Sequence, residues 1–252
     1  MAYPNMLYGP EGEQYNLYTG VSTAGSGSRW PWGTQMIMQD GRKYRYARAG
    51  GTLLVIGDVQ QNAATVANHV GTTAVASALG SKAPQTTLGA TAATANQYAQ
   101  GYFVVDVDPG KGLYVIDNHL AGTTATVYNL APGHAIRVAA LTTTSRISLI
   151  ANPYQGLIQF PATTPTNGIG GIAVSAIAAT TGEGWVQTAG TAAVLTSGTV
   201  IVGNIAVTTV GAGAAAPGSS TSQILKEAIV GYVTRVAASG AWSTIRLSGI
   251  DG

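Results

Sequence analysis

Short runs of alternating apolar and polar residues, divided by turns rich in glycine, recur along most of this chain. Alternation with a period of two is typical of β-strands that bury one face. Residues 102–107 and 113–116 flank an Asp-Pro-Gly turn and predict a hairpin, as do residues 43–48 and 52–56 across Ala-Gly-Gly. Further strands are predicted at residues 124–130, 135–141, 145–150, 172–178, 184–188, 192–195, 199–202, 205–209, 229–237 and 241–247.

Short strands at spacings of about 8–12 residues are typical of a β-sandwich or a barrel. We therefore predict a mostly β protein with one or more antiparallel β-sandwich or barrel-like domains. Residues 60–70 contain neither proline nor glycine and fit a short helix or a loop. The threonine and glycine content of the following stretch disfavours a helix there.

The run at residues 42–48 combines four basic side chains with two tyrosines. Basic residues that alternate with aromatics can bind nucleic acid. The period of two more simply fits a strand with Tyr44, Tyr46 and Arg48 on one face and Arg45 on the other. We favour a strand that is solvated or contacts a partner.

Composition divides the chain into three parts. Residues 1–35 are rich in Gly, Tyr, Ser and Pro and predict an extended N-terminal arm. Residues 36–160 predict a β-rich domain, and residues 161–252 a second β-rich domain or a continuation of the first. Large aromatics are costly to leave in water, so the arm should pack on its own body or on a neighbour. The candidate partner-contacting residues are Tyr3, Tyr8, Tyr15, Tyr18, Trp30, Trp32, Arg42 and Arg45.

Charge is scarce and unevenly placed. Charged residues make up 9% of the chain, against roughly 25% in an ordinary soluble domain, and the net charge is +2. So small a net charge does not favour electrostatic binding to nucleic acid or to an acidic membrane. Between residues 147 and 225 the only ionisable charge is Glu183. Hydroxyl groups can keep such a surface wet, or other subunits can cover it, since interface cores are poor in charge.

The chain has no cysteine, which excludes disulfides and thiolate metal sites and fits a cytoplasmic or phage origin. The N-terminus lacks the basic and apolar stretches of a signal peptide. The most apolar long window, residues 192–210, contains several threonines and glycines and is unlike a membrane helix. We expect no membrane association.

Candidate chemistry is sparse. The three histidines show no metal-ligand spacing. Asp106, Asp108 and Asp117 flank one predicted hairpin and could share a divalent cation, although turn chemistry explains them more simply. Glu183 and Trp185 fit either a sugar site or a charged turn. GxSxG, SxxK and Walker motifs are missing from the sequence, and carboxylates are few, so we predict a non-enzymatic protein without a metal or cofactor.

Several segments resemble virion proteins of tailed phages that are encoded near the major capsid protein. These segments are TTLGATAATANQYAQGY (86–102), PGKGLYVI (109–116), Asn152-Pro153-Tyr154, GWVQTAGTA (184–192) and the end of the chain, residues 229–247. The last of them is similar to the end of many phage decoration and head-structural proteins. The resemblance covers roughly residues 85–250.

The resemblance implies a capsid decoration, or cement, protein that is β-rich, forms a homotrimer and bridges neighbouring subunits of the major capsid protein. It implies a place on the capsid exterior of the virion, after assembly in the bacterial cytoplasm. Gly110 and Gly240 are expected in tight turns, and Trp185 and Tyr232 in the core. Deletion of residues 1–32 is expected to leave a folded protein that binds capsids weakly. The alternative is a tail- or head-fibre module that binds host glycans through exposed aromatic side chains.

Overall fold

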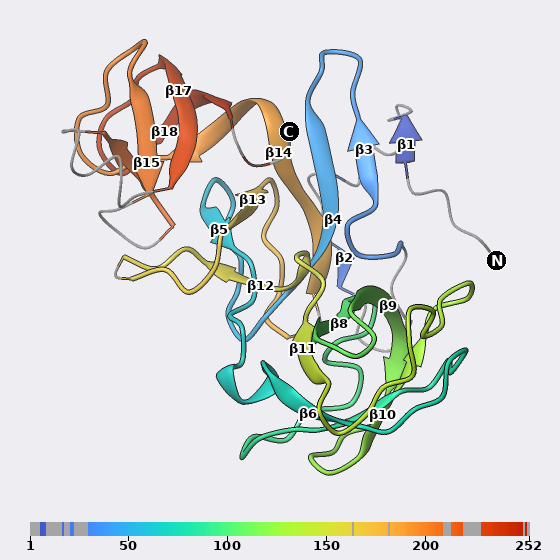
Figure 1. The fold of residues 1–252 in the computed structure, drawn as a ribbon. Coiled ribbons are helices and arrows are strands. Elements are labelled where there is room, and N and C mark those ends of the chain that lie inside the picture. The colour runs from blue at the N-terminus through green and yellow to red at the C-terminus, as the bar shows by residue number, and fades with distance from the viewer. Residues whose placement is uncertain are drawn as a thin grey trace. The chain divides into compact units, whose positions relative to one another are not determined.

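The computed structural model describes residues 6–8, 17, 21–22, 30–162, 164–180, 182–208, 213–218, 228–248 and 250. The regular structure is almost all β (Figure 1), which confirms the predicted fold class. A short 3-10 helix, η1 (Ala67–His69), lies in the stretch expected to be a short helix or a loop. The strands are β1 (Met6–Tyr8), β2 (Val21–Ser22), β3 (Gln35–Ile37), β4 (Lys43–Ala49), β5 (Val59–Gln61), β6 (Thr72–Val75), β7 (Gln85–Thr87), β8 (Tyr102–Val107), β9 (Gly112–His119), β10 (Thr126–Leu130), β11 (Arg146–Ile150), β12 (Gln155–Gln159), β13 (Ile169–Ala173), β14 (Gly182–Leu195), β15 (Ile205–Thr208), β16 (Ala215–Pro217), β17 (Ile229–Arg235) and β18 (Trp242–Leu247).

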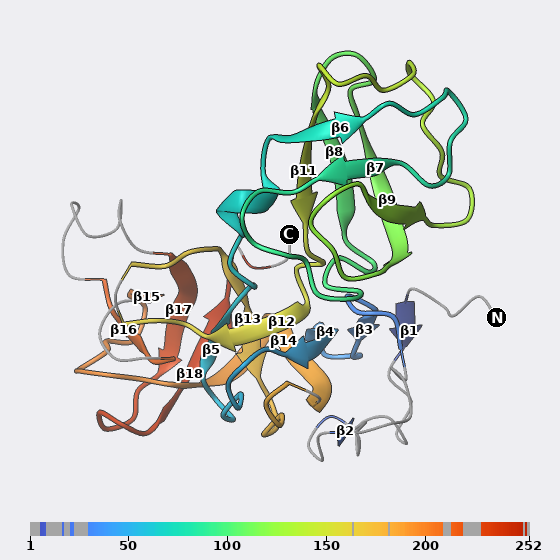
Figure 2. The same ribbon diagram turned by 90° about the horizontal axis from the view of Figure 1, so that it is seen from below.

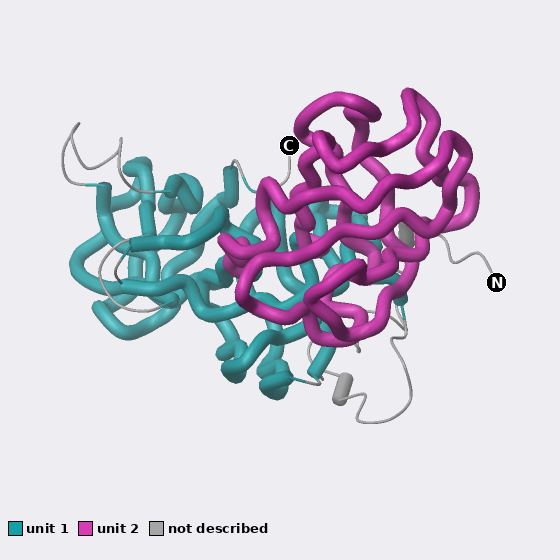
Figure 3. The backbone as a smooth tube through the Cα atoms, turned by 60° about the horizontal axis from the view of Figure 1, so that its bottom comes forward, with its two compact units in different colours: residues 1–63, 153–252 teal, residues 64–152 magenta. Residues whose placement is uncertain are grey.

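Two compact units make up the chain (Figure 3). Unit 1 consists of residues 1–63 and 153–252, and unit 2 of residues 64–152. Unit 2 is therefore an insertion in the sequence of unit 1. The expected division between residues 160 and 161 differs from this arrangement. Both units are made of short strands with similar turns, so the sequence pattern does not mark where the insertion begins and ends.

Unit 1 is built on a large sheet with the strand order β1-β3-β4-β12-β5-β13-β14-β18-β17-β15-β16, and β2 pairs with β14 (Figure 2). Because β4 also pairs with β14, the strands β4, β12, β5, β13 and β14 close into a ring, which we call the five-strand ring. One face of these strands carries an apolar cluster, the ring core. The ring core comprises Ala47, Ala49, Leu54, Leu157, Ala173, Ile177 and Val186.

The two faces of β4 contribute to different cores. Its alanines belong to the ring core, and its tyrosines belong to a second cluster, the aromatic cluster. The guanidinium of Arg48 lies over Trp32 on the aromatic side, and that of Arg45 lies over Tyr154, which packs against the ring core. The predicted division of β4 into two faces is thus confirmed. The aromatic cluster comprises Leu17, Met36, Met38, Tyr44, Tyr46 and Trp185, with Trp30, Trp32 and Val174 packed against it.

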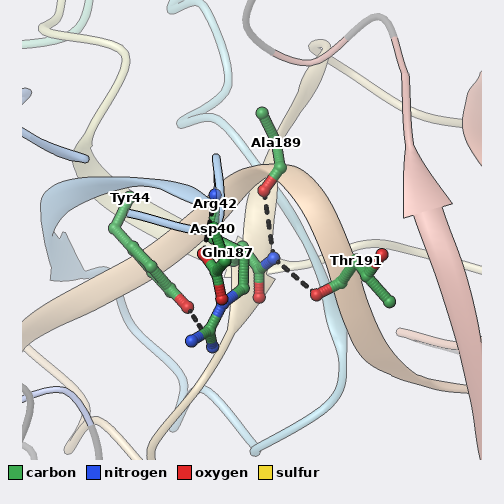
Figure 4. Close-up of polar contacts among 6 residues, drawn as sticks. All are labelled: Asp40, Arg42, Tyr44, Gln187, Ala189 and Thr191. Atoms are coloured by element: carbon green, nitrogen blue, oxygen red, sulfur yellow. Dashed lines mark hydrogen bonds and ion pairs between the residues drawn. The ribbon is translucent and has the colours of Figure 1, made fainter. Parts of the chain in front are cut away.

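β14 bends where it leaves β4 and begins to pair with β18 (Figure 4). Gly190 has a φ of +81°, a left-handed conformation that glycine adopts without strain. Gln187 holds the bend, since its Nε2 donates to the main-chain oxygens of Ala189 (3.0 Å) and Thr191 (2.9 Å). One strand can therefore serve both the five-strand ring and the C-terminal part of the sheet.

The C-terminal part of the sheet has its own core, formed mainly by residues of β14, β15, β17 and β18. Val230, Val233 and Ile245 face this core. Tyr232 lies on the opposite face, directly across from Arg246, and is 50% exposed. The expectation that Tyr232 fills the core is wrong, whereas Trp185, at 1% exposure, is a core residue as expected.

Unit 2 is a closed barrel with the strand order β10-β7-β6-β11-β8-β9. The predicted hairpin of residues 102–107 and 113–116 is confirmed as β8 and β9, and Gly110 in its turn has a φ of +95°. The barrel core comprises Ala74, Leu88, Ala93, Tyr98, Phe103, Val105, Tyr114, Ile116, Tyr128, Leu130, Ile136, Leu141, Ile147 and Leu149.

Several strand predictions are wrong. Residues 52–56 form no strand and contribute only the isolated bridge of Leu54 to Ile177. β4 instead pairs with β3, β12 and β14, so neither of its edges is left for a hairpin partner. Residues 135–141 and 199–202 also lack strands, although their apolar residues Ile136 and Val200 are buried. Burial of an apolar run therefore did not require a strand at these places.

Candidate partner-binding surface

The predicted contact residues of the arm are only partly described. Tyr3, Tyr15 and Tyr18 lie outside the described residues, and Tyr8 ends β1, whose side chains the structure does not describe. Trp30 and Trp32 are half-buried and pack against the aromatic cluster of their own unit. The end of the arm thus packs on its own body, the first of the two arrangements expected for it.

Glu183 is the buried carboxylate of the aromatic cluster, with 3% of its surface exposed. The indole Nε1 of Trp32 donates to its Oε1 (3.1 Å), and the hydroxyl of Tyr46 donates to its Oε2 (3.0 Å). Trp185 packs edge-on against Tyr46, with ring centroids 5.2 Å apart. Both carboxylate oxygens therefore have donors from the protein itself. Neither an exposed turn nor an open sugar site describes so enclosed a carboxylate.

Three arginines of unit 1 lie over aromatic rings, at distances typical of cation–π contacts. The pairs are Arg42 with Tyr44 (5.9 Å to the ring centroid), Arg45 with Tyr154 (5.8 Å) and Arg48 with Trp32 (5.8 Å). Arg42 also pairs with Asp40 (2.7 Å, Figure 4), and Arg45 donates to the main-chain oxygen of Gly33 (2.9 Å). Both predicted basic contact residues are thus half-buried and held by their own unit.

The three aspartates near the β8–β9 hairpin have separate partners. These partners are Ser148 for Asp106, Lys111 for Asp108 (3.2 Å) and Asn118 for Asp117 (2.7 Å). In the described part of the chain, no group of three His, Asp or Glu side chains is placed to hold a metal ion. The hairpin aspartates therefore act as strand-end and turn residues.

Two histidines are buried in unit 2 and are joined through Tyr98. The hydroxyl of Tyr98 lies 2.5 Å from Nδ1 of His69, and the main-chain N–H of Tyr98 donates to Nε2 of His119 (3.0 Å). The other ring nitrogens face main-chain oxygens, His69 Nε2 that of Thr91 (2.9 Å) and His119 Nδ1 that of Leu120 (2.8 Å). We call these groups the histidine network.

The histidine network fixes which nitrogens carry protons. A carbonyl oxygen only accepts, so His69 Nε2 and His119 Nδ1 donate, and His119 Nε2 accepts from the main-chain N–H of Tyr98. The His119 ring is therefore neutral, and a second proton on it would break its bond from the main-chain N–H of Tyr98. Burial lowers the pKa of His119 and raises the pKa of Tyr98 to about 12. His69, Tyr98 and His119 are thus buried groups that bond to one another and to the main chain of the barrel.

The outer face of β11, β8 and β9 carries a continuous apolar strip. Ile150 lies across from Tyr102, which lies across from Val115, and in the next row Val104 lies across from Leu113. Ile150 is 43% exposed and Leu113 is 56% exposed, and the other three side chains are half-buried. Phe103, Tyr114 and Leu149 alternate with them and face the barrel core. We call these five outward residues the barrel strip.

A second outward face lies on β17 and β18 of unit 1. Tyr232 is paired with Arg246, and Trp242, which precedes Arg246 by four residues on the same strand face, is 45% exposed. Ile201 and Val202, each 57% exposed, belong to the same unit. The sequence pattern predicted Tyr232 in the core, so it did not reveal this face.

No protein family model, curated protein or solved structure matches the chain. Among the described residues, no helix has the length and hydropathy needed to cross a membrane.

Proposed function

We propose that this chain is a structural virion protein of a tailed phage, which decorates the capsid as a trimer and bridges neighbouring subunits of the major capsid protein. The observation that carries the proposal is the barrel strip, an apolar outer face on strands whose inner face already has a complete core. Contiguous apolar surface of this kind marks sites of protein interaction. The resemblance of residues 85–250 to phage head proteins supplies the class of partner.

The scarcity of charge supports the same proposal. Glu183 is the only ionisable charge between residues 147 and 225, and it is buried in the aromatic cluster. The outer surface of that stretch is therefore neutral, which is typical of surface that other subunits cover. A trimer presents three equal contacts to the capsid, and linked contacts raise overall affinity by effective concentration. Modest individual interfaces then suffice for firm attachment.

The proposed role requires no catalysis. The carboxylate of Glu183 has a donor on each oxygen, and the buried histidines bond to main-chain groups. These residues stabilise the fold, and the chain acts by adding interface area between capsid subunits.

The experiment that tests this function uses phage heads prepared without the chain. Purified chain is added, the heads are sedimented, and bound chain is measured together with the temperature at which the heads release DNA. The proposal predicts saturable binding and a higher release temperature. Heads that neither bind the chain nor gain stability would rule it out.

A second candidate function is a fibre module that binds host glycans. The half-exposed rings of Tyr232, which is paired with Arg246, and of Trp242 on the same strand face favour it, because flat aromatic faces stack on sugar rings while a guanidinium donates to hydroxyls. A glycan array separates the two functions. Glycan binding that is lost in Trp242→Ala, with no binding to heads, would establish the fibre function instead.

A further inference from the structure

β5 and the residue before it, Asp58, place two polar side chains on the face that carries the ring core. Val59 and its cross-strand partner Ile172 face the C-terminal core. Asp58 and Gln60 alternate with Val59 and so point to the opposite face. Gln60 is paired with Gln159 of β12, two residues beyond the ring-core residue Leu157. Asp58 is 2% exposed and Gln60 is 0% exposed.

Hydrogen bonds fix the orientation of both side chains. Nε2 of Gln159 donates to Oδ2 of Asp58 (2.6 Å), and Nε2 of Gln60 donates to the main-chain oxygen of Asp58 (3.0 Å). Oδ1 of Asp58 and Oε1 of Gln60 are left buried with no hydrogen-bond partner among the described residues. Buried polar atoms without partners are rare and costly, so a donor is needed here.

Rotation of the Gln60 amide cannot supply that donor. Exchange of its oxygen and nitrogen would place Oε1 against the main-chain oxygen of Asp58, where two acceptors would repel. A carboxylate has no donor of its own, whereas a protonated carboxyl has one O–H. A proton on Oδ1 of Asp58 would supply the missing donor. Oε1 of Gln60 is also buried without a partner, and it can only accept.

The surroundings of Asp58 favour the uncharged form. A Cβ on Gly213 would lie 2.7 Å from Cγ and from Oδ2 of Asp58, so the chain encloses the carboxyl tightly. The described groups that face it from neighbouring segments are Gln159 of β12, Gln60 of β5 and Gly213, and none of them titrates or carries charge. Burial raises the pKa of Asp58, opposed by the hydrogen bond from Gln159. A charge without a counter-charge is costly in such a place.

We propose that Asp58 is a neutral carboxylic acid in the folded protein, donates a hydrogen bond to Gln60 and makes unit 1 sensitive to pH. Folding of unit 1 then takes up one proton wherever the unfolded chain holds Asp58 ionised. The unfolded carboxyl titrates near pH 3.9. The contribution of Asp58 to stability is therefore complete below that pH and is lost as the pH rises toward the folded-state value. High pH loosens the five-strand ring, and acid tightens it.

The test compares the intact chain with Asp58→Asn, a neutral variant of the same shape whose amide N–H₂ can donate to Gln60. All four tryptophans lie in unit 1, at positions 30, 32, 185 and 242, so their fluorescence follows the unfolding of this unit in urea. Above about pH 4, uptake of one proton changes the unfolding equilibrium constant by up to tenfold per pH unit. The unchanged chain should show this slope, and Asp58→Asn should lack it and be more stable at pH 8.

Asp117→Asn is the matched control, because it removes the same charge from an exposed site and should keep the slope of the unchanged chain. Infrared difference spectra of the unchanged chain against Asp58→Asn add a direct readout, the carbonyl band of a protonated carboxylic acid at neutral pH. A slope that is equal in the unchanged chain and in Asp58→Asn, or the absence of that band at neutral pH, would overturn the proposal. Destabilisation by Asp58→Asn at pH 8 would do so as well.

Discussion

Trp32 donates a hydrogen bond from its indole to the carboxylate of Glu183, over 3.1 Å and across 151 residues of sequence. The contact ties the end of the predicted arm to β14 of unit 1. The sequence predicted that Trp32 contacts a partner and that Glu183 belongs to a turn or a sugar site. Both residues instead belong to the buried aromatic cluster.

Trp32→Phe should destabilise unit 1 by about 1.5–3 kcal/mol, because it removes a hydrogen bond to a buried charged group. Urea unfolding followed by the remaining tryptophans measures the loss. Trp242→Phe is the matched control, since Trp242 is half-exposed and its loss should cost about 0.5 kcal/mol or less. Equal effects of the two substitutions would mean that the bond to Glu183 contributes nothing of its own.

Deletion of residues 1–32 should lower the stability of unit 1. The deletion removes Leu17, Trp30 and Trp32 from the aromatic cluster and takes a donor from Glu183. Thermal unfolding of the truncated chain checks this outcome. The sequence alone predicted that this truncated chain folds and binds capsids weakly. If the truncated chain is destabilised, however, weak binding does not show that the arm itself contacts the capsid. A truncation as stable as the full chain would contradict the packing described for these residues.

Gly190→Ala should destabilise unit 1 more than Gly41→Ala. Both glycines have left-handed φ values, +81° and +85°, so both substitutions carry the same backbone penalty of about 1–2 kcal/mol. Only at Gly190 would a Cβ meet neighbouring atoms, lying 2.9 Å from Cα of Arg42. Such overpacking adds about 1–3 kcal/mol. Indistinguishable unfolding free energies for the two variants would show that β14 can shift at its bend.

Unit 2 should lose stability as the pH falls below about 6.5. Burial lowers the pKa of His119, so the folded form holds the neutral ring while the unfolded chain binds a proton below that pH. The contribution of His119 is complete above about pH 6.5 and is lost progressively below it. Hydrogen exchange of residues 64–152 measures the change separately from unit 1. The loss of unit 2 stability at low pH should be smaller in His119→Gln than in the unchanged chain, and the same as in the unchanged chain in His134→Gln. A fall that is the same in all three proteins would exclude His119 as its source.

Leu113→Lys should weaken binding to phage heads at least tenfold and leave the unfolding free energy within about 0.5 kcal/mol, because Leu113 is exposed in the barrel strip. Co-sedimentation with heads and thermal unfolding provide the two readouts. Leu120→Lys is the matched control, since Leu120 is 81% exposed and lies outside the strip. If both variants bind heads as well as the unchanged chain, the strip is not the capsid contact.

Local patterns predicted the parts of the fold that form locally. The β8–β9 hairpin, the strands β17 and β18 and the two faces of β4 follow from alternation and from turns such as the one at Gly110. The pairing of β4 with β12 and β14 joins segments more than a hundred residues apart, and alternation carries no signal of such partners. The strands β6 and β7 are rich in threonine, so their polar sequence hid them.

The candidate surface was harder to predict than the fold. Alternation alone would place Val230 and Tyr232 on the same face of β17. A register shift against β15 lies between Ile229 and Gly231, and Val230 is buried whereas Tyr232 is exposed. The barrel strip depends on the lateral order of three strands, which no single strand reveals. Nothing in the local sequence marks Asp58 as buried, because it is enclosed by residues far away in the chain, among them Gln159 and Gly213.

Mass spectrometry of purified phage heads and tails, separated from each other, tests the central claim most directly. The proposed function predicts this chain on the heads, in a fixed ratio to the major capsid protein. Its presence on tails alone, or its absence from both fractions, would contradict a capsid role.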